Sequence, residues 1–479
     1  MSETVGTEVK DKYEWDKENA EAIYTESPVD FWKGNPLIEA LPEILPDEEL
    51  CFHLRSKCRI ERDKLAELPE AVRCICVDQL YDVFQPWDVH IRIARNLESA
   101  IRGGYTNRNP LKIDFVKQQR LVASHIEKKD ATFSGLTNNA KAPGFAIIGL
   151  SGMGKTTGIK RALAQYPQVI THSSYNGIPF PFTQIVWMRL NCPFDSSVKG
   201  LCIEFFQEFD RITGDNTYQR FAMSSRATTD IMLPQMALLA SRHGLGALVI
   251  DEIQNLSERK SRGKEQMLNF FTQLVNKIGV PVILVGTQAA VETLTSDVAT
   301  ARRFSGPNGA VIMNLLSADS DGWEMLLGGL QKQQWTTEEA NLLDESIQKV
   351  LHQETKGMVA HVVNLLVQAQ KAAIQSGRNK IDAKLISSVA HSDDNLMMRT
   401  LLNKLGQMTL SKTTDRDFML EITRLRANTS SVESNISCDK IEDSTEKQEP
   451  VEAPKRQKSK KKELPDLNAD IVKKGDEQF

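Results

Sequence analysis

Long apolar segments, a surplus of positive charge and paired cysteine motifs are all missing from this chain of 479 residues. No run of about eighteen apolar residues occurs, so no membrane-spanning helix is expected. The acidic N-terminus has neither the basic nor the apolar region of a signal peptide, and we therefore expect a cytoplasmic protein. A net charge of −4 argues against nonspecific nucleic-acid binding by the whole surface, but it leaves room for a local basic track.

Seven cysteines are scattered along the chain, and four of them lie near the N-terminus. Cys51, Cys58, Cys74 and Cys76, with His53 nearby, offer ligands for zinc. Their spacing differs from that of paired CxxC zinc knuckles, and Cys74 and Cys76 fall in an apolar run with a helical pattern. We therefore favour free, partly buried thiols and keep a zinc site as the alternative.

The middle of the chain, residues 126–317, alternates short apolar runs with helical patterns. Short, bounded apolar runs separated by helices are typical of a buried parallel sheet with an α/β fold. We expect the strands at residues 145–150, 184–190, 247–251, 281–286 and 310–315.

The regions on either side of this core have different patterns. Residues 1–125 lack strand-like alternation and are predicted to be mostly helical, including Leu65–Phe84 and a helix that stops at Gly103 and Gly104. Residues 318–405 are again helical and would form a lid. Residues 406–479 form a C-terminal extension whose polar tail cannot bury enough apolar surface to fold, so we predict that it is largely disordered.

A phosphate-binding motif begins at Gly149 with the sequence GLSGMGKTT. Its glycines permit the tight turns that point backbone N–H groups at phosphate oxygens, while Lys155 supplies positive charge and Thr156 a hydroxyl for Mg²⁺. The motif follows an apolar strand and opens a helical pattern, as phosphate binding requires, so we predict ATP and Mg²⁺ as ligands. The predicted nucleotide-binding residues are Gly149, Ser151, Gly152, Met153, Gly154, Lys155, Thr156, Thr157 and Asp251.

Asp251 and Glu252 end the apolar run at residues 247–251. An Asp at the carboxyl end of a buried strand beside a phosphate-binding loop is suited to hold Mg²⁺ together with Thr156. The adjacent Glu can polarise the attacking water as a general base. The alternative is a strand end with two solvated acids, but the motif upstream favours the catalytic interpretation.

Two further positions complete the predicted ATPase site. Thr287 follows the apolar run PVILVG and is expected to contact the γ-phosphate or the water, with Gln288 as the alternative. Arg302 and Arg303 precede the last apolar run, and either could reach a neighbouring subunit's nucleotide to stabilise transition-state charge. The alternative for this pair is a solvated helix end.

Together the motifs GLSGMGKTT, VIDEIQNL, ILVGTQAAV and ARRF resemble those of AAA+ ATPases of the initiator-like group. More narrowly, the chain resembles the transposon target-selection regulators TnsC, TniB and IstB over roughly residues 30–400. The stretches that favour the narrower group are NPLIEALP, GGYTNRNP and MRLNCPFDSSVKGLCIEFFQEFD. The resemblance departs at Ala360, which stands where many AAA+ lids carry an arginine that touches the γ-phosphate.

The resemblance implies a fold, an activity and partners. It implies an AAA+ P-loop ATPase that hydrolyses ATP to ADP and phosphate and assembles on duplex DNA as a homo-oligomeric ring or helical filament. It also implies that the protein links a target-selector protein, met by the N-terminal region, to transposase subunits, met by the C-terminal end. A pseudo-enzyme is disfavoured because Glu252 fills the position that activates water.

Basic residues in two loops are the candidates for DNA contact. Lys199 lies in the region where relatives touch the DNA backbone, and a second stretch follows the Asp251–Glu252 pair. Lys and Arg on the phosphate backbone would give salt-dependent, sequence-independent binding, whereas the alternative for each loop is a solvated surface. The candidates are Lys199, Arg259, Lys260 and Arg262.

Two function classes remain open at this point. The first is the transposition regulator, which predicts ATP-dependent oligomers on duplex DNA. The second is an initiator-like or signalling AAA+ switch that acts on a protein partner without such oligomers. No C-terminal helix-turn-helix with a basic recognition helix is apparent in the sequence, which weakens the initiator version.

Overall fold

A computed structural model of the chain describes residues 19–58, 60–127, 144–195, 197–223, 228–256, 267–268, 270–271, 279–294, 302, 304 and 309–408. All of them belong to one compact unit, Met1–Asp415, whereas Arg416–Phe479 lie outside the described residues. No helix among the described residues is long and apolar enough to cross a membrane.

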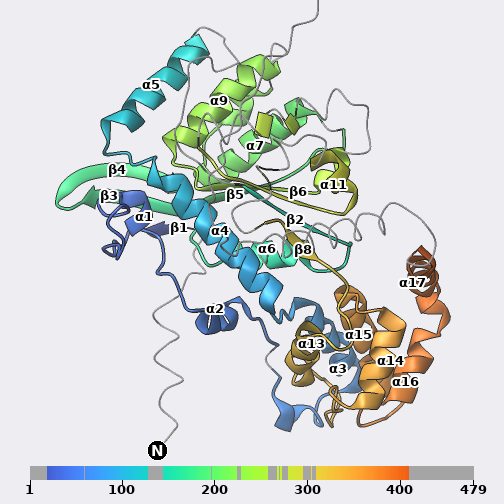
Figure 1. The fold of residues 1–479 in the computed structure, drawn as a ribbon. Helices are drawn as coiled ribbons and strands as arrows, with labels where there is room; N and C mark the ends of the chain where they lie inside the picture. The colour runs from blue at the N-terminus through green and yellow to red at the C-terminus, as the bar shows by residue number, and fades with distance from the viewer. Residues whose placement is uncertain are drawn as a thin grey trace, which may run out of the picture. The chain divides into compact units, whose positions relative to one another are not determined.

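A five-stranded parallel sheet forms the centre of this unit, and the predicted α/β fold is confirmed. Its strands stand in the order β5-β6-β7-β2-β8 (Figure 1). Strands β2, β6 and β7 are buried along their whole length, which explains their uninterrupted apolar sequences. The five strands are β2 (Phe145–Gly149), β5 (Trp187–Asn191), β6 (Ala247–Asp251), β7 (Val282–Gly286) and β8 (Val311–Met313).

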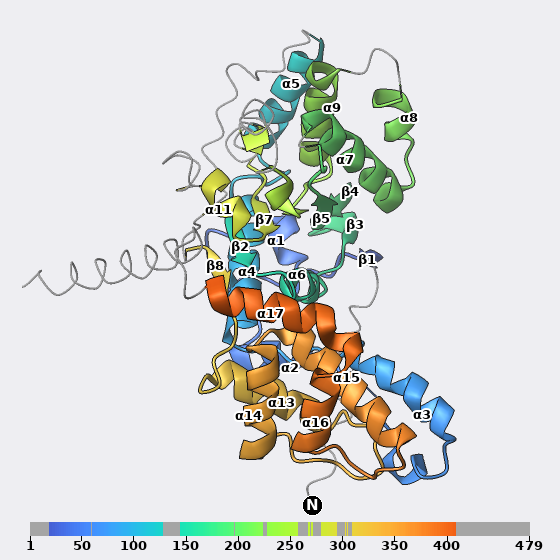
Figure 2. The same ribbon diagram turned by 90° about the vertical axis from the view of Figure 1, so that its right-hand side faces the viewer.

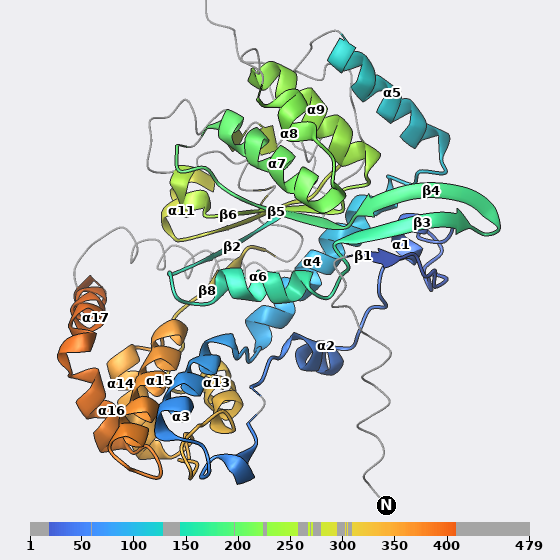
Figure 3. The same cartoon turned by 180° about the vertical axis from the view of Figure 1, so that it is seen from behind.

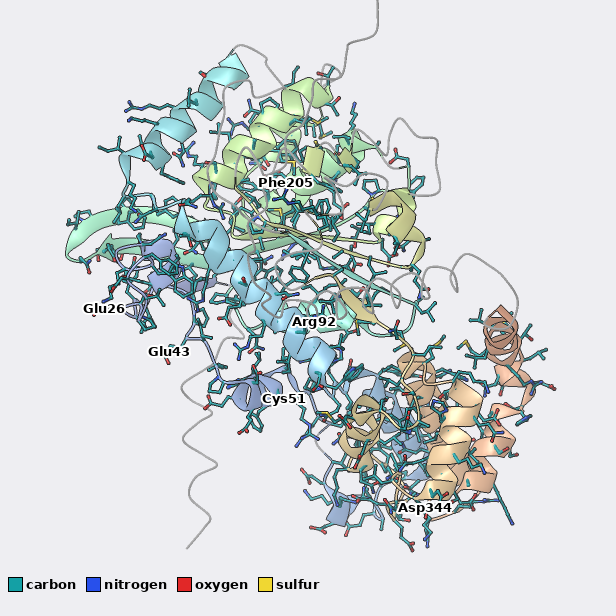
Figure 4. All side chains as sticks on the ribbon, viewed as in Figure 1. Glu26, Glu43, Cys51, Arg92, Phe205 and Asp344 are labelled. Atoms are coloured by element: carbon teal, nitrogen blue, oxygen red, sulfur yellow. The ribbon has the colours of Figure 1, made fainter. Side chains whose placement is uncertain are left out.

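Helices cover both faces of this sheet (Figures 1 and 3). On one face lie α4 (Asp88–Thr106) and α6 (Lys155–Leu163), which contact each other and the central strands. On the other face lie α7 (Val198–Thr213) and α9 (Thr229–Arg242), with α5 (Ile113–Glu127) packed against α9. Phe205, labelled in Figure 4, lies on α7 and is fully buried.

Helix α4 corrects one prediction, because it runs through Gly103 and Gly104 instead of stopping there. A Cβ at Gly104 would lie 2.9 Å from Pro281 Cδ and 3.1 Å from Arg108 Nη2. This glycine therefore permits close packing of the helix on the start of β7, and it is not a stop signal. Arg92 of the same helix, labelled in Figure 4, donates to the Ala310 carbonyl at 2.9 Å and ties α4 to the segment before β8.

A second, three-stranded sheet was not predicted. The apolar run at residues 184–190 divides at Val186, so its first part ends a hairpin and its second part becomes β5. Strand β1 lies in a region predicted to be helical, and it pairs parallel with β3. The sheet has the order β1-β3-β4 and consists of β1 (Asn19–Glu21), β3 (Val169–Tyr175) and β4 (Ile178–Ile185).

The region after the core, predicted to be helical at residues 318–405, consists mostly of helices. Its helices lie at one end of the described unit (Figure 2), and three of them, α14, α15 and α16, contact one another. Asp344 caps one of these helices by accepting from the backbone N–H of Ser346 at 3.0 Å. The helices are α13 (Asp321–Gln331), α14 (Glu345–Thr355), α15 (Val359–Gln375), α16 (Ala383–Ala390) and α17 (Leu396–Met408).

The segment before α4 packs on these lid helices. The predicted helix at Leu65–Phe84 is instead a short α-helix, α3 (Glu70–Cys76), followed by a 3-10 helix, η2 (Val77–Asp82). Both contact α15, and Tyr81 donates to Asn364 Oδ1 at 2.9 Å. The remaining helices are α1 (Pro36–Glu39), α2 (Asp47–Leu54), η1 (Arg62–Lys64), α8 (Thr217–Phe221), η3 (Ile253–Leu256), α11 (Ala289–Leu294) and η5 (Asp393–Asn395).

Candidate nucleotide and magnesium site

The loop between β2 and α6 has the backbone shape of a phosphate cradle. Gly152 and Gly154 have φ angles of 82° and 83°, which side-chain-bearing residues rarely adopt. A Cβ at Gly149 would lie 2.4 Å from the Met313 carbonyl oxygen, so only glycine fits where β2 runs beside β8. The N-terminus of α6 opens directly on this loop at Lys155, with Gly154 as its left-handed cap.

Lys155 is held at the mouth of the loop. Its Nζ donates to the Leu150 carbonyl at 2.9 Å, and 9% of the residue is exposed. Burial lowers the pKa of this ammonium group, while the nearby carboxylates of Asp251 and Glu252 raise it. A phosphate in the cradle would add negative charge beside it and would favour the charged form further.

Thr156 and Asp251 meet as the sequence predicts for Mg²⁺ ligands. The Thr156 hydroxyl donates to Asp251 Oδ2 at 2.9 Å, and Arg189 Nη1 lies 3.7 Å from the same oxygen. Asp251 Oδ1 accepts from the backbone N–H of Glu252 at 2.9 Å. A hydroxyl and one carboxylate suit Mg²⁺, which usually takes its other ligands from phosphates and water. When bound, Mg²⁺ would offset negative charge on the phosphates.

Glu252 begins a sharp turn after β6. Its φ of 59° lies in the left-handed region, which costs a non-glycine residue about 1 to 3 kcal/mol. Its Oε2 accepts a hydrogen bond from Gln254 Nε2, and Gln254 Oε1 accepts from the backbone N–H of Thr287 at 3.1 Å. Glu252, Gln254 and Thr287 therefore lie together at the carboxyl ends of the neighbouring strands β6 and β7.

The lid closes the cavity through its backbone. Ala360, near the start of α15, donates its N–H to the Gly152 carbonyl at 2.9 Å. Its methyl lies 3.3 Å from the Cβ position of Gly152, so a larger side chain there would crowd the phosphate loop. His361 is buried and does not line the cavity. Of the described residues that line this cavity, Lys155 is the one Lys or Arg.

These groups line one cavity of about 420 Å³. We call its polar side the phosphate end: it comprises Ser151 to Thr157, Asp251, Glu252, Gln254, Gly286 and Thr287. We call the opposite side the apolar end. It is formed by Tyr81, Val83, Phe84, Gln85, Trp87, His90, Leu326, Leu330, Val359 and Val363.

The apolar end was missed by the sequence analysis. It joins η2 and the start of α4 to the lid helices α13 and α15. His90 lies in an aromatic corner there, with its ring centroid 4.1 Å from that of Trp87 and 4.8 Å from that of Phe84. Burial lowers the pKa of His90 to about 3, so the ring stays neutral at physiological pH. No motif in the sequence marks these residues.

The other predicted site residues lie apart from this cavity or outside the described residues. Arg302 is an exposed helical residue, and it does not line the cavity. Lys199 is exposed in the first turn of α7, where Ser197 caps the helix by accepting from Gly200 N at 2.9 Å. Arg303, Arg259, Lys260 and Arg262 lie outside the described residues.

The N-terminal cysteines are reduced thiols in the structure. Cys51, Cys58, Cys74 and Cys76 are half-buried, and burial raises the pKa of Cys58 to about 11. Within the described part of the chain, no group of three or more His, Cys, Asp or Glu side chains is arranged to hold a metal ion.

Comparison with known proteins identifies the core. Residues 140–294 match the family model described as an AAA domain. These residues form an AAA domain. The matched segment contains the phosphate loop, Asp251, Glu252 and Thr287, and therefore the whole phosphate end of the cavity. No curated protein matches the sequence.

Three solved structures are distantly similar to the chain. A Walker-type ATPase of Pyrococcus abyssi is 14% identical, with 61% of this chain and 75% of that chain covered and a TM-score of 0.34. The Aeropyrum pernix ORC2 protein, in complexes with ADPNP and ADP, is 13% identical, with coverage of 60% and 68% and a TM-score of 0.36. A structure of Drosophila ORC bound to DNA is 12% identical, with coverage of 58% and 65% and a TM-score of 0.32.

Proposed function

We propose that the AAA domain binds ATP with Mg²⁺ and hydrolyses it to ADP and phosphate. The observation that carries this proposal is the meeting of Lys155, the Thr156–Asp251 pair and Glu252 around one cavity. Lys155 and the loop N–H groups would hold the β- and γ-phosphates, and Thr156 with Asp251 would hold Mg²⁺. The apolar end of the cavity would offer the adenine ring of ATP a surface that excludes water.

In the proposed reaction, Glu252 takes a proton from water as the water oxygen attacks the γ-phosphorus. The bond between that phosphorus and the β–γ bridging oxygen breaks, and its electron pair stays on ADP. Thr287 lines the cavity beside Glu252 and is suited to contact the water or the γ-phosphate. Since no described Arg lines the cavity, a cation from a second copy, Arg302 or Arg303, would complete the transition-state charge.

Release of phosphate from ATP by the purified chain tests this step. We expect turnover that depends on added Mg²⁺ and stops with a chelator in excess. A chain that binds ATP tightly but releases no phosphate, alone or with DNA, would limit the domain to nucleotide binding.

We further propose that the chain is a transposition regulator that assembles on duplex DNA and links a target-selector protein to the transposase. The sequence resemblance to TnsC and its relatives supports this role. Lys199 supports it as well, because it is exposed in the first turn of α7 and is therefore accessible to a phosphate backbone. The N-terminal region and the extension after residue 405 would meet the two protein partners.

Electron microscopy of the chain with duplex DNA, with and without a nonhydrolysable ATP analogue, tests the DNA step. Rings or helical filaments that need both the analogue and DNA would support it. A Lys199→Glu variant should weaken assembly on all sequences alike and reduce the salt slope by about one phosphate contact. ATP binding and turnover without any DNA assembly would favour the alternative, an initiator-like or signalling switch acting on a protein partner.

A further inference from the structure

Gln254 connects two parts of the phosphate end that the proposed mechanism requires to act together. Its Nε2 donates to Glu252 Oε2 at the end of β6, and its Oε1 accepts from the Thr287 N–H at 3.1 Å at the end of β7. One side-chain amide therefore joins the proposed base to the strand that faces the γ-phosphate. The amide group thus donates toward Glu252 and accepts from Thr287.

The backbone around Gln254 is shaped for this bridge. Residues Ile253–Leu256 form the 3-10 helix η3, which packs against β7 and turns the Gln254 side chain back over the strand end. A Cβ at Gly286 would lie 2.6 Å from Ile253 Cγ1 and 3.0 Å from Gln254 Oε1. Glycine at this position therefore leaves the space that the amide occupies.

Glu252 needs such a partner because its own backbone does little to fix its side chain. The residue is exposed, and its carboxylate stands on a left-handed turn with φ of 59°. Asn191, which pairs with Asp251 across β5 and β6, directs its Nδ2 to Glu204 Oε1 at 3.1 Å. The structure thus gives Gln254 the contact with the Glu252 carboxylate.

We propose that Gln254 is a positioning residue for hydrolysis, an inference that rests on the proposed ATPase function. Its N–H group holds Oε2 of Glu252, which leaves Oε1 free to take the proton of the attacking water. Its bond to Thr287 N–H fixes the amide, so the carboxylate keeps its place relative to the phosphate end as a whole. An error of about 1 Å in such a position can cost about 100-fold in rate.

Two substitutions separate the two hydrogen bonds. Gln254→Met keeps the length of the side chain and removes both bonds. Gln254→Glu keeps an acceptor for Thr287 N–H but replaces the donor to Glu252 with a second negative charge. If the bond to Glu252 is the one that positions the base, both variants should lower kcat by about 10- to 100-fold, with Gln254→Glu at least as slow as Gln254→Met.

The readout must distinguish positioning from a folding defect. Both variants should keep the KM for ATP and the affinity for a nonhydrolysable analogue within about twofold of the wild-type values. Their Tm should stay within a few degrees of the wild-type Tm. Gln207→Met, an exposed residue of α7 away from the cavity, is the matched control and should leave kcat unchanged.

A double-mutant cycle with Glu252→Gln completes the test. Because Gln254 acts through Glu252, Gln254→Met should have almost no further effect on kcat once Glu252 is replaced. Additive losses, or a Gln254→Met chain with wild-type kcat, would overturn the inference while leaving the proposed ATPase in place. Absence of turnover in the wild-type chain itself would instead overturn the proposed function, and the inference with it.

Discussion

The two ends of the nucleotide cavity are built in opposite ways. The phosphate end consists of one continuous loop, Ser151 to Thr157, and the carboxyl ends of two adjacent strands. The apolar end combines residues of the segment from Tyr81 to His90 with Leu326, Leu330 and Val363. These three belong to helices that follow that segment by more than two hundred residues. Backbone N–H groups and a few charges dominate the first end, and side-chain packing dominates the second.

This difference separates two kinds of binding energy. At the phosphate end, substitution of one charged or coordinating group should remove binding or chemistry almost completely, because the remaining groups cannot replace it. At the apolar end, several side chains share the contact with the ligand, so removal of one should cost only the area that it buries. The predictions below test this contrast, beginning with the largest expected effect.

Lys155→Ala should abolish ATP binding, because the phosphates lose the one Lys or Arg among the described residues that line the cavity. The loss should be as complete for inorganic triphosphate as for ATP, since both depend on the phosphate end. Titration of each ligand by calorimetry measures this. Lys160→Ala, an exposed lysine on the same helix, should bind both normally. Micromolar ATP affinity in the Lys155→Ala chain would show that the phosphate loop is not the binding site.

Glu252→Gln should leave ATP binding intact and slow hydrolysis by about 100- to 10,000-fold, because an amide cannot take the proton of the water. Single-turnover phosphate release, with the affinity for ATP measured in parallel, separates the two quantities. If oligomers on DNA require the γ-phosphate, the variant should also stay assembled longer than the wild-type chain. Wild-type turnover in this variant would assign the base to another residue.

The phosphate end was predictable from the sequence because its chemistry resides in consecutive residues. A loop that must turn sharply needs glycines at fixed positions, and the lysine and threonine that follow must open the helix, so the spacing itself carries the prediction. Asp251 was predicted as a site residue because a buried strand ends at it, and the structure places its carboxylate beside the Thr156 hydroxyl.

The apolar end and the second sheet were not predictable in this way. Trp87 and His90 look like any buried pair at the start of a helix, and only the fold brings them to the lid. The division of the apolar run at Val186 also has no signal in the sequence, because it depends on contacts with distant residues. The Val186 N–H donates to the Gln168 carbonyl at 2.9 Å, and the Val186 carbonyl accepts from the Ala247 N–H at 3.0 Å. Gly103 and Gly104 misled the prediction because close packing and helix termination both use glycine.

Val363→Ala should weaken ATP binding by only about 5- to 10-fold, since the lost methyl groups are worth roughly 1 to 1.5 kcal/mol of apolar contact. Affinity for inorganic triphosphate should not change, which is the opposite of the Lys155→Ala result. Competition between a fluorescent ATP analogue and either ligand measures both values. Val350→Ala, a half-buried lid valine that does not line the cavity, controls for loss of lid packing. Equal weakening of ATP and triphosphate would mean that the two ends do not act separately.

The last effect is on folding stability instead of ligand binding, and it concerns the charge of His90 at the apolar end. Burial lowers the pKa of this ring from 6.5 to about 3, so the unfolded chain binds a proton between these values that the folded chain does not. The stability that the neutral ring supports is therefore complete above pH 6.5 and is lost as the pH falls toward 3. Between pH 7.5 and pH 5 this one residue should cost about 2 kcal/mol of the free energy of unfolding.

His90→Gln should remove that slope while keeping a side chain that can accept from the Trp87 N–H, as His90 Nδ1 does at 3.3 Å. Urea unfolding at a series of pH values measures the slope in both chains. Burial also lowers the pKa of His172, His243 and His361, but these residues are common to both chains, so their contribution cancels in the difference. At pH 7.5 the two chains should differ by a constant packing term alone. Parallel curves from pH 7.5 down to pH 5 would mean that water reaches the ring and that the apolar end is not closed in the folded chain.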